Sequence, residues 1–352
     1  MRGWIQRPVR EQKVIDYLGE ASYRSMMEAS LGMTWPVPVA GTDFCIVSGD
    51  LIPTIRGGGF SDYAEVVAAQ DRGLFQRLNL YVSTTTSFNN TWQQMGYDTF
   101  PSVLPSPSTA SSGRSYTRAD HAIHQEPVSG KSLYICAVHS RSNSVGPVLL
   151  TDMLWGFRFV IGSGEDLTAD HQDFGCSASL PRYTGTGDLG SSRGNYAAVC
   201  VKSTTSPVNS NHTWNLTYSD HLGNTSETSS IAGHTSTQIT SYTSPATWVD
   251  HNGFLFPMNS GDMGVSTISN ISIDYPGGVG ATAPAASHEL WVHHPLMFVP
   301  AGYSTEENLT WETVGNNFNM AKVEDDACLT MWQYRISTSA MRFSTVVDLV
   351  AG

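Results

Sequence analysis

Charged side chains are scarce in this 352-residue chain. Only 14% of its residues are Asp, Glu, Lys or Arg, whereas an ordinary soluble domain has about 25%. The charges are also unbalanced, because 31 acidic residues face 19 Lys and Arg and give a formal net charge of -12. An acidic chain repels phosphate backbones, so the composition argues against a specific nucleic-acid partner.

Long apolar runs are absent as well. No run approaches the roughly 20 residues of a membrane span, and the sequence MRGWIQRPVREQK at the start has no apolar signal-peptide core. We therefore expect no membrane partner and no Sec-dependent export. Hydrophobic residues still make up 40% of the chain, which excludes wholesale disorder.

Paired cysteines are missing too. The five cysteines lie far apart, none belongs to a CxxC pair, and their number is odd. This arrangement supports neither a zinc cluster nor a full disulfide framework. We expect buried, small hydrophobic side chains made in a reducing compartment at these positions, which are Cys45, Cys136, Cys176, Cys200 and Cys328.

Helical patterns are confined to an N-terminal region, residues 1–82. Apolar residues recur near helical spacing in residues 10–31 and again in the stretch SDYAEVVAAQDRGLFQRL, which begins at Ser61. Between the two, Pro36 and Pro38 forbid a helix interior and favour an extended arm. We expect this helical and arm region to dock on partners.

Residues 83–130 show no periodicity. Prolines alternate with small polar residues in FPSVLPSPSTASSGRS, which is typical of an extended segment. A stretch of this length without regular structure is uncommon inside a compact domain. We therefore expect a strap that lies on a neighbouring subunit.

A β-rich region follows, residues 131–300. Short β runs such as SLYICAVH, NYAAVCVK and ELWVHHPLMFV are separated by Gly, Pro, Asn and Asp. Trp214, Leu216 and Tyr218 alternate with polar residues, which predicts a strand with one buried face. The isoleucines around Asn270 slip by one residue, which predicts a bulge. The pattern predicts a mainly β fold, a jelly-roll-like β-sandwich with an N-terminal helical and extended arm region.

The C-terminal segment, residues 301–352, stays apolar and contains two further β-like runs, ACLTMWQYRI and MRFSTVVDLV. A terminus this apolar is normally tied down. Two outcomes are open, because the segment either completes the sandwich or pairs with another subunit by strand addition.

Motifs for catalysis are weak. No Walker A motif is present, and Ser, His and Asp residues cannot be assembled into a triad from sequence alone. Residues 120–126 hold two imidazoles and two carboxylates, but they lie beside the proline-rich strap, without the helical i, i+4 spacing that zinc ligands favour. Residues 165–173 are acidic but lack the DxDxDG core of a calcium loop. We expect polar loops at both places, with no catalytic residue, metal or cofactor.

Two adjacent histidines, His293 and His294, lie in a predicted strand that we place last in the sandwich. Side chains of neighbouring strand residues point to opposite faces. The two imidazoles therefore cannot both face one metal ion.

Nine tryptophans raise the alternative of sugar binding, because an exposed indole can stack on a sugar ring. Trp155 and Trp214 lie inside β runs, and we expect them in the core. The sequence leaves both readings open for four others near predicted loop edges, Trp92, Trp248, Trp291 and Trp311.

Four motifs follow one another between about residues 131 and 300. They read LLTDMLWGFRFV, SLPRYTGTGDLGSSRGNYAAVCV, NLTYSDHLGNTSETS and GFLFPMNSGDMGVSTISNISI. In this order and spacing they resemble a family of virion structural proteins of tailed bacteriophages. The resemblance implies a β-rich particle component without enzymatic activity, repeated many times by symmetry.

The function expected from these features is that of a capsid decoration or cement protein, or a minor head protein, which stabilises the shell of a bacteriophage. Its partners would be the major capsid protein, other virion proteins and further copies of itself in a homo-oligomer. It would reside in the virion after assembly in the cytoplasm of the host bacterium. The alternative is a tail-associated protein that binds a receptor or a glycan.

The segments expected to contact partners are rich in proline or apolar residues. They are residues 35–39, 100–108 and 346–350. Within them we single out Trp35, Pro36, Pro38, Phe100, Pro101, Pro105, Val346 and Leu349.

Overall fold

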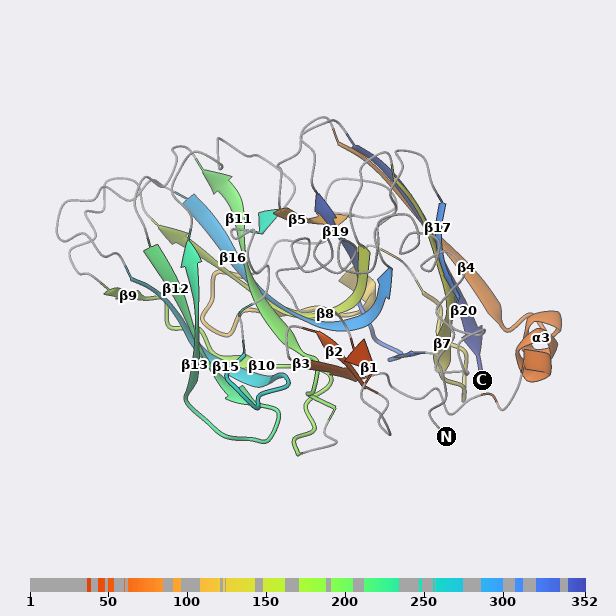
Figure 1. Ribbon diagram of the computed structural model, residues 1–352, viewed down its shortest axis with the longest axis horizontal. Coiled ribbons are helices and arrows are strands. Elements are labelled where there is room, and N and C mark those ends of the chain that lie inside the picture. Colours follow the sequence, from red (N-terminus) through yellow and green to blue (C-terminus); the bar gives the residue numbers. More distant parts are fainter. Residues whose placement is uncertain are drawn as a thin grey trace.

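The protein is mainly β, with antiparallel sheets and a single α-helix among the described residues (Figure 1). A computed structural model describes residues 37–38, 44–47, 50–53, 60, 63–84, 91–95, 108–120, 123, 125–142, 148–161, 171–187, 191–204, 212–233, 247–248, 256, 258–274, 286–299, 308–312, 321–335 and 341–352. The predicted mainly β, jelly-roll-like sandwich is confirmed. No helix in this part of the chain is long and apolar enough to cross a membrane.

Three sheets build the body of the molecule. The central sheet contains, in spatial order, β16 (Ala286–Val299), β11 (Tyr196–Thr204), β14 (Thr247–Trp248), β5 (Thr91–Met95), β19 (Leu329–Arg335), β8 (Val148–Ile161) and β6 (Arg114–Ser115). The polar sheet contains β10 (Ala178–Ser179), β15 (Val265–Asp274), β12 (His212–Asp220) and β13 (Glu227–Gly233), with β9 (His171–Asp173) paired to β15. The helix-backed sheet contains β17 (Asn308–Glu312), β7 (Leu133–Ser142), β20 (Met341–Ala351) and β4 (Phe75–Thr84), with β18 (Lys322–Val323) paired to β7.

Smaller elements complete the fold. A separate three-stranded sheet joins β1 (Val37–Pro38), β2 (Phe44–Val47) and β3 (Asp50–Pro53). A 3-10 helix, η1 (Arg118–Asp120), follows β6. The only α-helix in the described ranges is α3 (Tyr63–Asp71).

The central sheet closes on itself, because β16 pairs with β8 as well as with β11. This circuit of strands explains why both faces of β16 are buried. His293, Trp291 and, from β19, Trp332 have no exposed surface. Leu290 and Val292 alternate with Trp291 and His293 along β16, and their side chains point to its other face, into the core against the polar sheet.

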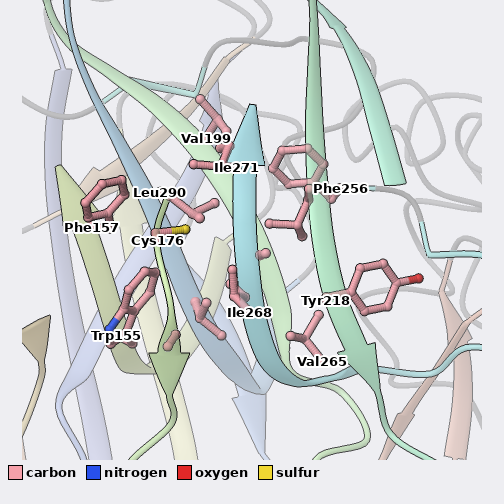
Figure 2. Close-up of a cluster of buried hydrophobic side chains, with 14 of the residues drawn as sticks. Trp155, Phe157, Cys176, Val199, Tyr218, Phe256, Val265, Ile268, Ile271 and Leu290 are labelled. Carbon is pink, nitrogen blue, oxygen red and sulfur yellow. The ribbon is translucent and has the colours of Figure 1, made fainter. Parts of the chain in front are cut away.

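The first core fills the space between the polar sheet and the central sheet. Trp155 and Phe157 of β8 contribute to it from one side, and Tyr218, Ile268 and Ile271 of the polar sheet from the other (Figure 2). All five side chains are buried. Burying each of these large side chains contributes about 1.5–3 kcal/mol, so this layer holds the polar sheet in place.

The second core lies between the other end of the central sheet and the helix-backed sheet, on the right of Figure 1. Leu150 of β8 and Met331 of β19 meet Ile135 of β7 and Leu349 of β20 here. On the far face of the helix-backed sheet, α3 packs against Tyr134, Cys136 and Val350. The two long strands β8 and β16 therefore run through both cores.

Two β-bulges keep one face of these long strands turned toward both cores. Leu154 is the extra residue on β8, since Val292 pairs with Trp155 and His293 with Met153. Leu296 is the extra residue on β16. A bulge shifts the alternation by one, so that Leu150 and Asp152 face the same side as Trp155 and Phe157.

The second predicted helical stretch is confirmed as α3, which runs from Tyr63 to Asp71 and ends earlier than its sequence pattern suggests. The first, residues 10–31, lies outside the described residues. Gly73 adopts a φ of 74°, its N–H donates to Gln70 O (2.9 Å), and Leu74 N–H donates to Ala69 O (3.0 Å). This pair of bonds is a Schellman C-cap, which needs a left-handed residue and therefore favours glycine. The chain then continues directly as β4.

Several strand predictions are also confirmed. Trp214, Leu216 and Tyr218 are buried, and the polar residues between them are not. The bulge predicted near Asn270 is present, because Thr217 pairs with Asn270 and Tyr218 with Ile268. The C-terminal run completes a sheet, since β20 is hydrogen-bonded to β7 on one side and to β4 on the other.

One glycine is fixed by close backbone contact. A Cβ on Gly264 would lie 2.8 Å from Gly194 N and closer still to Ser192 O. We expect Gly264→Ala to lower the free energy of unfolding by about 1–3 kcal/mol, because backbone atoms cannot move aside as a side chain can. Exposed Ser260 in the neighbouring turn gives the control, and Ser260→Ala should change it by less than about 0.5 kcal/mol. Equal stabilities of the two variants in urea unfolding would contradict the packing described.

Candidate functional site

A cluster of buried polar side chains lies between the two cores, and we call it the polar joint. Asp152 of β8 and His294 of β16 are direct cross-strand partners. On one side of this pair come Leu150 and Met297 of the second core, and on the other Trp155 of the first. The joint therefore interrupts an otherwise apolar surface at the boundary of the cores.

Arg182 supplies the charge that balances Asp152. Its Nη2 donates to Asp152 Oδ1 at 2.6 Å and its Nε to Asp152 Oδ2 at 2.9 Å, in a bidentate pair. The other acceptors of Arg182 are the carbonyl oxygens of Tyr116 (2.9 Å) and Met153 (3.1 Å), and Cys328 N–H donates to Asp152 Oδ1 (2.8 Å). The side chain of Asp152 is 0% exposed and that of Arg182 9%. Burial raises the pKa of Asp152, and Arg182 opposes that shift.

Arg182 reaches the joint because of the local sequence after β10. Leu180 is anchored in the first core, and the next residue, Pro181, has its φ fixed by the pyrrolidine ring. Tyr183 then takes a φ of 51°, a left-handed conformation that is rare outside glycine. Asn195 holds the peptide there, since its Nδ2 donates to Tyr183 O (2.8 Å) and to Val265 O (2.9 Å).

His294 closes the joint from the β16 side. Its ring stacks on that of Tyr183 with centroids 3.9 Å apart and planes inclined by 8°. Because both amide hydrogens of Asn195 are engaged, Asn195 Oδ1 accepts, and His294 Nδ1–H is the donor at 2.9 Å. This assignment leaves His294 neutral, with the lone pair on Nε2. Burial lowers its pKa to about 3.

His293 points to the opposite face of β16, as the sequence predicts for adjacent strand residues. Its ring stacks on Trp332 at 6.0 Å, inside the closed circuit of the central sheet. Burial, with His294 nearby, lowers the pKa of His293 to about 3. Both imidazoles are therefore neutral at pH 7, and they do not face one common ion. The expectation that they occupy the last strand is wrong, because β17 to β20 follow β16.

The chemistry of the joint is electrostatic rather than nucleophilic. The Cys328 thiol beside Asp152 is fully buried, and burial raises its pKa well above the usual range. Burial likewise raises the pKa of Tyr183. Both groups stay protonated at pH 7. The geometry is suited to locking segments from β8, β16, the 180–183 loop and the turn before β19 against one another.

The solvent-facing side of the polar sheet is a second candidate site, which we call the hydroxyl face. Alternation and cross-strand register place polar residues at nearly all positions of this face, whereas position 232, opposite Thr213, is an alanine. None of them is Lys or Arg. They are His171, Asp173, Ser179, Thr213, Asn215, Thr217, Ser219, Thr228, Ser230, Thr267, Ser269, Asn270, Ser272 and Asp274.

Hydrogen bonds cross the hydroxyl face from strand to strand. Ser230 Oγ donates to Asn215 Oδ1 (2.6 Å), and Asn215 Nδ2 donates to Asp274 Oδ2 (2.6 Å). His171 bonds to Asp274 through Nδ1 (2.5 Å) and to Asp173 through Nε2 (3.1 Å). The bond to Asp274 is the main reason that the pKa of His171 is raised. The ionisable groups of this face thus lie together at one end of the sheet and partly neutralise one another.

The residues predicted to contact partners are distributed as follows. Pro38 lies in β1, opposite Cys45. Val346 and Leu349 lie in β20, where Leu349 is buried in the second core and Val346 is half-buried. Five lie outside the described residues, namely Trp35, Pro36, Phe100, Pro101 and Pro105. Their role in contacts stays a prediction, as do the boundaries 1–82, 83–130, 131–300 and 301–352.

The described part of residues 83–130 packs against other strands of the same chain. It provides β5 and β6 to the central sheet, and Tyr116 and Gln125 are fully buried. Asp120 accepts hydrogen bonds from Arg114 and from Thr117 N–H. No group of three or more potential metal ligands occurs among the described residues. His121 and His124 lie outside them.

Tryptophans and cysteines follow their predictions where their side chains are described. Trp155 and Trp214 are buried, as expected, and so is Trp291, which the sequence left open. The side chains of Trp92, Trp248 and Trp311 lie outside the described part. Three cysteines are free and buried, namely Cys136, Cys176 and Cys328.

Two short motifs escape the sequence reasoning above. Residues 185–190 read GTGDLG and match a dinucleotide-binding glycine pattern, and residues 190–194 read GSSRG and match a serine nucleophile elbow. Both motifs need a strand before them and a helix after them. Here the described chain passes from β10 through a loop into β11. Ser192 is buried and its Oγ donates to Gly185 O (2.7 Å), so the hydroxyl stabilises the loop.

What sequence reasoning missed most is the joint itself. Asp152 and Arg182 are 30 positions apart in the sequence. Asp152 did give a weak signal, since it is a charged residue inside the apolar run VLLTDMLWGF. A charge at a buried strand position needs a partner, but the sequence does not say which arginine supplies it.

Comparisons with known proteins give distant matches only. No family model and no curated protein matches the chain. Among solved structures it is similar to T=1 particles derived from infectious bursal disease virus, with 8% identity, a TM-score of 0.19 and coverage of 79% of this chain and 78% of that one. It is also similar to the Gx strain of that virus (10% identity, TM-score 0.19, coverage 79% and 81%) and to its T13 viral particle (8%, 0.21, 79% and 78%). These are virus particles but not tailed bacteriophages. With TM-scores this low, the description of the fold rests on the strands of this chain alone.

Proposed function

We propose that the protein is a structural subunit of a virus particle and has no catalytic role. In the finer form of this proposal it decorates or cements the head of a tailed bacteriophage. Its partners are then the major capsid protein and further copies of itself, and it is assembled in the cytoplasm of the host bacterium. Many interfaces of about 1,000 Å² or more would together hold the shell against internal pressure.

The observation that carries the proposal is the hydroxyl face. A protein surface that stays in water normally carries charged residues of both signs, which oppose association. Thr217, Thr228 and Ser230 take those positions here, and no Lys or Arg lies among the face residues. Side chains this short lose little rotamer entropy when a neighbour covers them. The face is therefore suited to burial against another subunit.

The polar joint supports a mechanical role. It ties the sheets through a bidentate Arg–carboxylate pair rather than through apolar packing alone. Such a pair fixes orientation as well as distance. Arg182 thereby holds the two cores in one relative position, which a subunit under load requires.

A charge on the hydroxyl face tests the proposal. We expect Thr217→Lys to reduce incorporation into particles at least about tenfold, because burying an unpaired ammonium group in an interface costs more than about 1.4 kcal/mol. Copies per particle can be counted by quantitative gel densitometry of purified virions. Ser129→Lys, in the exposed turn that leads into β7 of the helix-backed sheet, is the matched control and should incorporate normally. Normal incorporation of Thr217→Lys would refute the role of this face.

A further inference from the structure

The 180–183 segment covers the polar joint, where Arg182 and Tyr183 make its contacts with β8 and β16. Arg182 bonds to Asp152, and Tyr183 stacks on His294. The left-handed φ of Tyr183 costs about 1 kcal/mol or more and persists only while its surroundings fix it. The stack on His294 is one of the contacts that fix this conformation, together with the bond from Asn195 to Tyr183 O, so its loss would weaken that hold.

His294 can bind one more proton, on Nε2, but no hydrogen-bond acceptor faces that atom among the described residues. Its Nδ1–H already donates to Asn195, and its Nε2 is buried with no hydrogen-bond partner among the described residues. A proton on Nε2 would create a buried, unsatisfied donor together with a buried positive charge. Stacking on the Tyr183 ring returns only part of that cost.

The charged and titratable groups around His294 cannot compensate for this charge. The buried carboxylate, Asp152, already accepts from Arg182 and from Cys328 N–H. Tyr183 and Cys328 are neutral. His293, the preceding residue of β16, is also neutral and cannot offset a positive charge on His294. Three other acids lie near the joint. Asp120 is paired with Arg114, and half-buried Glu324 and exposed Asp326 lie in the turn before β19.

We propose that the polar joint is an acid-sensitive latch, in which protonation of His294 releases the 180–183 segment and opens the joint while both cores stay folded. β8 and β16 continue to connect the cores after opening, and the bulge at Leu154 is the point at which β8 can bend. The latch is a property of this chain and does not depend on its role in a particle.

The size of the effect follows from proton linkage. His294 has a pKa of about 3 in the closed joint and 6.5 as its ordinary value. A group that binds its proton more tightly in the open form favours opening as the pH falls through that range. Between pH 7 and pH 4.5 the opening equilibrium should shift by about 70-fold toward the open form. Asp152 has the opposite effect. Its pKa is raised in the closed joint, so protonation of Asp152 favours the closed form.

Hydrogen exchange measured by mass spectrometry on the full chain tests the latch. Protection factors are compared at pH 7 and pH 4.5 after correction for intrinsic exchange rates. We expect peptides covering residues 180–187 and 325–328 to lose protection up to about 70-fold, since the amide of Cys328 bonds to Asp152 across the joint. β12 and β20 should keep protection factors well above those of the joint peptides at both pH values, although the fall in global stability lowers their protection too. Equal protection of joint and core peptides at pH 4.5 would overturn the proposal.

Two substitutions separate His294 from other histidines. Asn in place of His294 keeps a side-chain N–H that can reach Asn195 but cannot be protonated, so His294→Asn should abolish most of the pH-dependent loss. His171→Asn removes an exposed histidine on the hydroxyl face and should leave the loss intact. An unchanged response in His294→Asn would overturn the latch. If that variant does not fold, the contrast between joint and core peptides in the wild-type protein still decides the question.

Discussion

Replacement of Arg182 by methionine should lower the free energy of unfolding by about 3–5 kcal/mol. Methionine keeps much of the length of the side chain but removes the guanidinium group, which leaves the 0% exposed carboxylate of Asp152 without its counter-ion. Breaking a buried ion pair on one side only is among the most destabilising single changes in proteins. Urea unfolding followed by tryptophan fluorescence measures the loss.

The chain contains a matched control for this experiment. Arg77 also makes a bidentate pair, with Asp348 at 2.8 Å for both bonds, but its side chain is 59% exposed. We expect Arg77→Met to cost about 1 kcal/mol or less, because water screens an exposed pair. The double variant Arg182→Met with Asp152→Leu should recover most of the lost stability, since both charges are then gone. A small effect of Arg182→Met by itself would mean that the joint is hydrated.

Between pH 7 and pH 5 the protein should lose about 4 kcal/mol of stability through its two buried histidines. His293 and His294 have pKa values of about 3 in the folded protein and 6.5 ordinarily. Unfolded chains therefore bind more protons than folded ones, from about half a proton at pH 7 to about two at pH 5, so the free energy of unfolding falls as the pH falls. The loss begins near pH 6.5 and continues toward pH 3.

Chemical denaturation at a series of pH values checks this prediction. His294→Asn should remove about half of the slope between pH 6 and pH 4, while His171→Asn should not reduce it. The raised pKa of His171 acts in the opposite direction, since protonated His171 is stabilised by Asp274 in the folded state. A stability that stays constant from pH 7 to pH 5 would show that the two imidazoles are reached by water.

The sequence predicts the parts of this fold that depend on local pattern. Alternation identifies the buried face of β12, and a one-residue slip identifies the bulge in β15. A run of apolar residues places Trp155 inside the structure. These features are visible because each is decided by residues within one strand.

The parts that depend on strand order are not visible in the sequence. β8 and β16 serve two cores only because bulges at Leu154 and Leu296 correct their alternation, and a bulge at either place has no marker residue. The pairing of Asp152 with Arg182 depends on how β8 meets the loop after β10. The hydroxyl face likewise becomes one surface only when β9, β12, β13 and β15 are placed side by side.

The position of β20 has a consequence for biosynthesis. β20 lies between β4 and β7 and pairs Val350 with Phe75, so the last of the described strands to be synthesised is the one that joins the others of its sheet. Until it leaves the ribosome, β4 and β7 each lack a neighbour, and strands without partners invite association with other chains. Sequence separations this long also slow folding. The helix-backed sheet must therefore form after translation of β20, and a chaperone that shields nascent edges would raise the yield.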